Sequence, residues 1–188
     1  MGTPFSWHPG IPPVPSFWYP NYVITTAAGG SSLTTGQMHF YPVMVSVPHA
    51  YQNIGVWVTT AGTSAILRFG IYADTGLGVP GALIYDAGAA TAPTGAQGVQ
   101  QTLNSLTLFP GQYWLSVVQS SASSAATVLC DTSSRNSAVF GQTALAASLV
   151  QSSGYVATTG FFAQTGSLPL AAPAALTAEL APFLQIEA

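Results

Sequence analysis

The stretch AILRFGIYADTGLGVPGALIYDAG, residues 65–88, predicts two strands joined by a turn. Both flanks are rich in β-branched and aromatic residues, which suit a pleated and half-buried surface. Between them, Asp74, Pro80 and Gly81 provide a side chain that accepts bonds from backbone amides, a fixed φ and access to positive φ. We therefore expect an antiparallel hairpin here.

This hairpin also holds three charged side chains in a chain that has few. The full sequence of 188 residues contains only two Lys or Arg and five Asp or Glu. We expect Asp74 to accept hydrogen bonds from amides of the turn. We expect Arg68 to pair with Asp86 across the hairpin. We therefore expect these three charged side chains to have structural roles rather than catalytic ones.

The same alternation of strand-like and turn-like segments continues along the chain. In one segment, Ile54, Val56 and Val58 fall on one strand face. About nine such segments, without a helical period between them, predict an all-β fold, an antiparallel jelly-roll-like β-sandwich. The segments are 21–26, 38–47, 53–60, 65–72, 82–88, 99–108, 112–119, 125–130 and 154–159.

The length suits one domain with tails. Residues 1–20 contain six prolines with aromatic residues between them, which predicts an extended arm. The sandwich is assigned to 21–167, within which 131–154 fit either a loop or a short helix. Residues 168–188 form a tail, in which 174–180 fit a helical turn. The last residues fit either a closing strand or an arm bound to a partner.

Composition excludes several classes of protein. Charged residues make up 4% of the chain, against about 25% in ordinary soluble domains. Two arginines cannot neutralise a row of phosphates, so we expect no nucleic-acid partner. No apolar run approaches the roughly 20 residues of a membrane-spanning helix, so we expect no membrane insertion. The N-terminus lacks a cationic leader with an apolar core, so we expect no cleaved signal peptide.

No catalytic residue, metal site or cofactor is expected. The histidines show no metal-binding spacing, and Cys130 lies in the apolar run ATVLC, which is typical of a buried thiol. Asp131 precedes two serines and Arg135, but no G-x-S-x-G turn accompanies them. The segment GLGVPG joins strand to strand, which does not suit a phosphate loop. The three histidines are His8, His39 and His49.

Several segments together resemble a module of tailed-bacteriophage virion proteins, found in tail fibres, tail tips and other exterior parts. They are YPVMVSVP, IGVWVTTAG, the hairpin, LTLFPGQYWLSVV and the final PFLQIEA, which cover roughly residues 40–120 and the C-terminal end. The sequence VQQTL stands where the pattern would have a charge. The matching residues are Arg68, Gly70, Ile71, Tyr72, Asp74, Pro80, Gly81, Asp86, Gly88, Leu108, Pro110, Gly111, Tyr113, Trp114 and Leu115.

The resemblance implies a non-enzymatic structural protein on the exterior of a virion, commonly a homotrimer. A fibre, a spike and a capsid decoration component all remain open. Related β-sandwiches also occur as carbohydrate-binding and adhesive modules. The alternative is therefore a receptor module for viral attachment that recognises a host surface glycan.

Aromatic residues are the candidates for contacts with partners. We expect the arm to dock into a neighbouring subunit or another virion protein, with buried aromatic anchors. Other aromatic residues could stack on a sugar where they are exposed, although sandwich cores use most such residues for packing. The anchors are Trp7, Phe17, Trp18 and Tyr19. The candidates for glycan stacking are Trp57, Tyr85, Tyr113 and Trp114.

Overall fold

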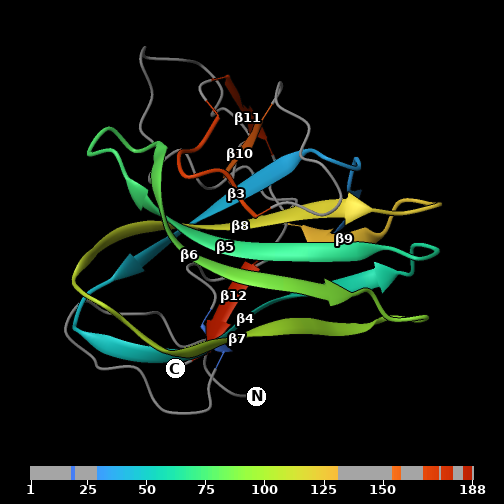
Figure 1. The fold of residues 1–188 in the computed structure, drawn as a ribbon, viewed down its shortest axis with the longest axis horizontal. Coiled ribbons are helices and arrows are strands. Elements are labelled where there is room, and N and C mark those ends of the chain that lie inside the picture. The colour runs from blue at the N-terminus through green and yellow to red at the C-terminus, as the bar shows by residue number, and fades with distance from the viewer. Residues whose placement is uncertain are drawn as a thin grey trace.

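A computed structural model describes residues 18–19, 29–130, 154–157, 167–173, 175–179 and 184–187. Within these ranges the chain forms strands and turns and no helix. Two six-stranded antiparallel sheets lie one above the other (Figure 1). The predicted all-β antiparallel sandwich is confirmed. The predicted strand at 21–26 and the segment 131–153 lie outside the described residues.

The first sheet, called sheet A, is built around β4. On one edge β4 pairs with β7, and its other edge is shared by β12 and β9. Beyond these, β1 pairs with β12 and β2 pairs with β9. The strands are β1 (Trp18–Tyr19), β12 (Leu184–Glu187), β4 (His49–Thr60), β9 (Thr127–Cys130), β2 (Gly29–Ser32) and β7 (Gln97–Leu108).

The second sheet, sheet B, contains the hairpin with which the sequence analysis began. The hairpin strands are longer than predicted and are offset by three register shifts. In spatial order the strands are β11 (Leu176–Glu179), β10 (Gly154–Ala157), β3 (Met38–Val45), β8 (Gly111–Ser121), β5 (Ile66–Asp74) and β6 (Pro80–Thr91).

The C-terminal tail contributes a strand to each sheet. Strand β12 pairs with β4, so the closing strand is the alternative that the structure adopts. The helical turn predicted for 174–180 is wrong, because Leu176–Glu179 form β11 and pair with β10. This ladder provides backbone partners that outweigh the weak local preference of so short a segment.

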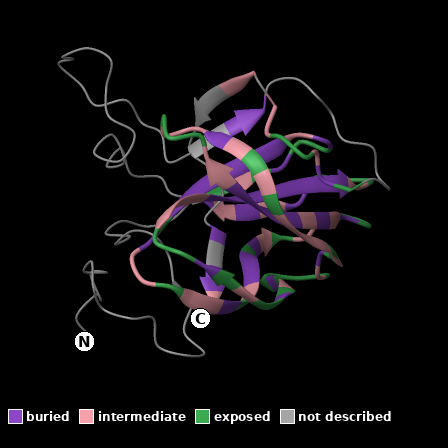
Figure 2. Ribbon diagram, turned by 60° about the vertical axis from the view of Figure 1, so that its left-hand side comes forward, coloured by how far each residue is buried: buried purple, intermediate pink, exposed green. Residues whose placement is uncertain are grey.

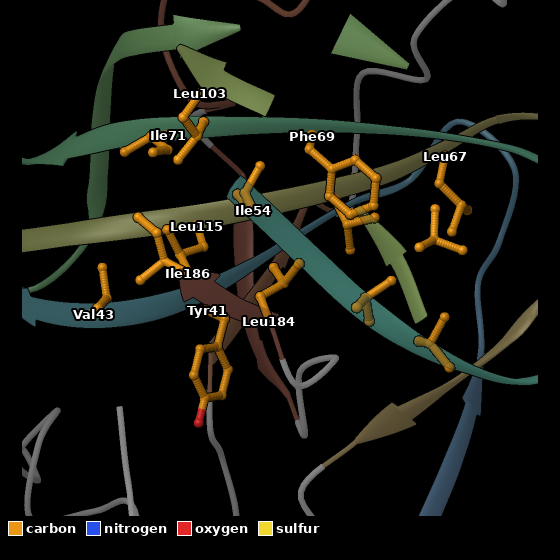
Figure 3. Close-up of a cluster of buried hydrophobic side chains, with 14 of the residues drawn as sticks. Tyr41, Val43, Ile54, Leu67, Phe69, Ile71, Leu103, Leu115, Leu184 and Ile186 are labelled. Carbon is orange, nitrogen blue, oxygen red and sulfur yellow. The ribbon is translucent and has the colours of Figure 1, made fainter. Parts of the chain in front are cut away.

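The main core lies between the two sheets. Alternate residues of β5 point inward, and Ile54, Val56 and Val58 of β4 meet them from sheet A. Figure 3 shows Ile54 and Ile186 of sheet A in one cluster with side chains of sheet B. Each such side chain contributes about 1.5–3 kcal/mol on full burial. The predicted shared face of the three β4 residues is confirmed.

A second core lies on the outer face of sheet B. Strand β8 is buried without interruption from Trp114 to Ser120, which requires cover on both faces of the sheet. In Figure 2, buried positions follow one another along strands of the upper sheet. The buried members of this second core are Met38, Phe40, Tyr72, Trp114, Val118, Ala157 and Leu168.

Candidate functional site

The segment 167–173, which we call the strap, runs along the free edge of β6. The amide of Leu83 donates to the carbonyl of Leu170 at 2.8 Å, and the amide of Ala172 donates to the carbonyl of Gly81 at 2.7 Å. An antiparallel bridge joins Ala82 to Ala171 between these bonds. The strap therefore extends the hairpin of sheet B, although it is distant in sequence.

The outward face of β5 carries a row of four residues, which we call the β5 stripe: Arg68, Gly70, Tyr72 and Asp74. The two-residue period of a strand puts them on one face, opposite the inward Leu67. All four belong to the motif behind the phage resemblance. Each one contacts, or makes room for, a specific partner.

Gly70 makes room for the strap. A Cβ atom built at this position would collide with the side chain of Leu168. Next along the stripe, the hydroxyl of Tyr72 donates to the carbonyl of Pro169 at 3.0 Å. Burial raises the pKa of Tyr72, and the charge of Asp86 raises it further, so the hydroxyl stays protonated and can donate.

Asp86 joins the hairpin to the strap through four donors. Arg68 donates from Nε to Oδ1 at 3.1 Å and from Nη2 to Oδ2 at 2.8 Å, which is the predicted ion pair in bidentate form. The amide of Gly88 donates to Oδ1 and the amide of Leu168 to Oδ2, each at 3.0 Å. The contact with Leu168 was not predicted.

The charge of Asp86 is held by these bonds. Partial burial raises the pKa of this carboxyl, but the hydrogen bonds from Arg68, Leu168 and Gly88 and the charge of Arg68 together lower it below its ordinary value. Asp86 is therefore an ionised structural group. It is not a proton donor poised for neutral pH.

Asp74 fixes both the hairpin turn and a buried indole. Its Oδ2 accepts from the amides of Gly76 at 2.6 Å and Gly78 at 3.3 Å, as predicted for the turn. These glycines have φ of 85° and 72°, which favours glycine. Its Oδ1 accepts from Nε1 of Trp114 at 2.8 Å. Pro80 opens β6 directly after the turn.

Trp114 is therefore not a surface for a sugar, and this part of the prediction is wrong. The side chain is fully buried in the second core, because the apolar outer face of sheet B is covered. Tyr85 and Tyr113 are half-buried against the main core. The hydroxyl of Tyr85 accepts from Asn104 at 3.1 Å.

Tyr113 has a local structural partner. Its hydroxyl donates to the carbonyl of Phe109 at 2.9 Å, across the turn that contains Pro110 and Gly111. The remaining candidate, Trp57, is 47% exposed on the outer face of β4. The four stacking candidates thus do not gather in one site, and Trp57 is the one with a large exposed surface.

The predicted anchoring residues are described only in part. Trp18 and Tyr19 form β1, with Trp18 opposite Glu187 and Tyr19 opposite Ile186. The end of the arm therefore adds a strand to this chain's own sheet A. Trp7 and Phe17 lie outside the described residues, so their predicted docking stays a prediction.

The polar candidates for chemistry are dispersed. In the described part of the chain, no group of three or more His, Cys, Asp or Glu side chains could hold a metal ion. His39 is buried, His49 packs edge-on against Tyr51, and Cys130 is buried. No helix among the described residues is long and apolar enough to span a membrane.

No family model matches the chain, and no curated protein matches it.

Proposed function

We propose that this chain is a non-enzymatic structural protein of the exterior of a tailed-bacteriophage virion. In this proposal it is a homotrimeric fibre, spike or decoration component, attached through residues 1–20. The proposal starts from the resemblance of the hairpin and of LTLFPGQYWLSVV to such modules. A structural protein that supports or attaches other virion proteins needs a stable fold and does not need an active site.

The observation that carries the proposal is the use of charge. Arg68, Asp74, Asp86 and Glu187 are the charged side chains that the structure describes, and each is hydrogen-bonded within the chain. Catalysis needs an acid, base or nucleophile held next to a substrate rather than bonded into a turn or a strap. This arrangement favours a structural part over an enzyme.

Assembly of several copies has a further argument in its favour. Large apolar side chains are exposed near β6, with Leu77 at the hairpin turn 85% exposed and Leu170 on the strap 84% exposed. Contacts between subunits would remove such surface from water. We assign the strap side of sheet B to the subunit interface.

Two measurements test the proposal. Light scattering of the purified full-length protein should give the mass of three chains, and proteomics of particles of the encoding phage should contain the chain. Deletion of residues 1–17, which keeps β1, should leave the β circular dichroism unchanged and remove the protein from particles. A monomer at micromolar concentration would refute the trimer. Particles that keep the truncated protein at full occupancy would refute anchoring by the arm.

A further inference from the structure

The outer face of sheet A has a different character from that of sheet B. It is formed by alternate residues of two paired strands, with Trp57 opposite Gly98, Gly55 opposite Gln100 and Asn53 opposite Thr102. We call these six residues the Trp57 face. Its positions on β7 are all exposed to solvent. The face is polar apart from one indole and two glycines.

Trp57 is placed like a flat platform. A Cβ atom built on Gly98 would lie 3.8 Å from Cε3 and 3.9 Å from Cζ3 of the indole, so the six-membered ring lies against this glycine. The next residue on the same face of β4 is Gly55, which also has no side chain. An aromatic ring that covers glycine on a neighbouring strand is a known way to support a sheet. Here it leaves 47% of the residue exposed.

Hydrogen-bonding groups lie beside this ring. Gln100 is exposed on β7, one residue pair along the face from Trp57, a step of roughly 7 Å along a strand. One further step away, Nδ2 of Asn53 donates to Oε2 of Glu187 at 2.6 Å. This bond fixes the orientation of the Asn53 amide and of the Glu187 carboxylate.

We propose that the Trp57 face binds a neutral saccharide. The indole stacks on the apolar face of a pyranose ring, which presents axial C–H groups to it, and Gln100 with the Asn53–Glu187 pair bonds to hydroxyls of the same or the next sugar. The six residues of this face carry no charge, and Glu187 beside Asn53 adds one carboxylate next to them. An acidic polysaccharide would therefore be repelled.

A second copy of the chain fits this face less well. The fully buried centre of a subunit interface is more apolar than the rest of the surface, is depleted in charged residues and usually combines several aromatic residues or methionines. The Trp57 face has a single large apolar side chain among amide, hydroxyl and glycine positions. The inference goes beyond the structural role proposed above and does not depend on membership of a virion, since the isolated protein can be tested.

The test is a binding titration of the full-length protein with neutral tetrasaccharides of glucose, mannose, galactose and N-acetylglucosamine, with polygalacturonate as the acidic comparison. Calorimetry and tryptophan fluorescence report binding. We expect at least one neutral probe to bind, Trp57→Ala to weaken it tenfold or more, and Gln100→Ala to weaken it about threefold. Polygalacturonate should not bind.

Phe109→Ala is the matched control, because Phe109 is an exposed aromatic residue, 63% exposed, in the turn between β7 and β8. This variant should bind like the unmodified protein, and circular dichroism should show that both aromatic variants fold. The proposal is overturned if no neutral probe binds at millimolar concentration or if Trp57→Ala binds as well as the parent. It is also overturned if Trp57→Ala instead causes an oligomer of the protein to dissociate. That result would show that the Trp57 face contacts a second copy of the chain.

Discussion

The outer faces of the two sheets differ in how far they are covered by the rest of the chain. On sheet B the outward side chains include Tyr72 and Trp114, and the strap closes over them to form a second core. On sheet A the outward side chains include Asn53 and Trp57, and Trp57 remains exposed together with the β7 positions beside it, although Gly55, between Asn53 and Trp57, is buried. Both faces follow the same strand alternation. Their difference teaches that alternation assigns residues to a face, whereas the chemistry of that face determines whether another segment covers it.

The largest expected effect compares the two tryptophans. Trp114→Ala removes a fully buried ring and leaves Asp74 without its indole donor, so it should lower the free energy of unfolding by about 3–5 kcal/mol. Trp57→Ala removes a half-exposed ring and should lower it by less than about 1 kcal/mol. Urea unfolding followed by circular dichroism measures both. Similar losses for the two variants would contradict the contrast between the faces.

Local chemistry made the hairpin predictable. Asp74, two glycines and Pro80 lie within a few residues of one another, so their turn geometry follows from the sequence, and the Arg68–Asp86 pair spans only the same hairpin. Strand β2 was not predicted, because GGSS has the composition of a turn and becomes a strand by pairing with β9. Here pairing across the sheet decides the structure.

The strap could not be predicted because its contacts cross the whole domain. The amide of Leu168 donates to Asp86, which lies 82 residues earlier in the sequence. Position 70 requires glycine because Leu168 packs against it, and the sequence alone does not show this contact. A signal was present in QYWLSVVQ, where apolar residues occupy both strand faces. Such a strand requires cover on both sides. It does not reveal which segment provides the cover.

The next prediction tests the contact between the strap and the β5 stripe. Leu168→Ala should lower the free energy of unfolding by about 2–4 kcal/mol, because it leaves a cavity in the second core. Gly70→Ala should cost about 1–3 kcal/mol through overpacking against Leu168. In the double variant the alanine methyl occupies space that Leu168 has vacated. The two losses should therefore sum to more than the loss of the double variant.

Urea unfolding of the parent, the two single variants and the double variant gives this coupling directly. Phe109→Ala is the control, because Phe109 is 63% exposed in the turn between β7 and β8, away from the strap, and its effect should stay within about 0.5 kcal/mol. Additive losses for Gly70→Ala and Leu168→Ala would mean that the strap does not lie over Gly70.

A smaller effect is expected from the charge that joins hairpin and strap. Asp86→Asn keeps one acceptor oxygen but loses the charge that pairs with Arg68, so it should cost about 1–2 kcal/mol at pH 7. The folded pKa of Asp86 lies below the value of about 3.9 in an unfolded chain. The stabilisation is therefore fully present above that value and is lost as the pH falls through the folded pKa.

Unfolding in urea at pH 7, 5, 4 and 3 checks the sign. The gap in stability between the parent and Asp86→Asn should stay constant from pH 7 to 5 and shrink below about pH 4. Arg68→Met removes the other member of the ion pair and should also reduce the loss of stability that the parent shows between pH 5 and pH 3. A gap that widens in acid would show that Asp86 does not bear its charge in the folded protein.

The smallest effect compares two glycines, one on each outer face. A methyl group on Gly98 would meet the indole of Trp57 at ordinary contact distance, whereas one on Gly70 would collide with Leu168. Because glycine costs a strand about 0.5–1 kcal/mol relative to alanine, Gly98→Ala should leave stability unchanged or raise it by up to that amount. The same substitution thus has opposite signs on the open and covered faces. A loss above about 1 kcal/mol for Gly98→Ala in urea unfolding would mean that the Trp57 face is packed as tightly as the strap side, and the saccharide site proposed there would lose its open platform.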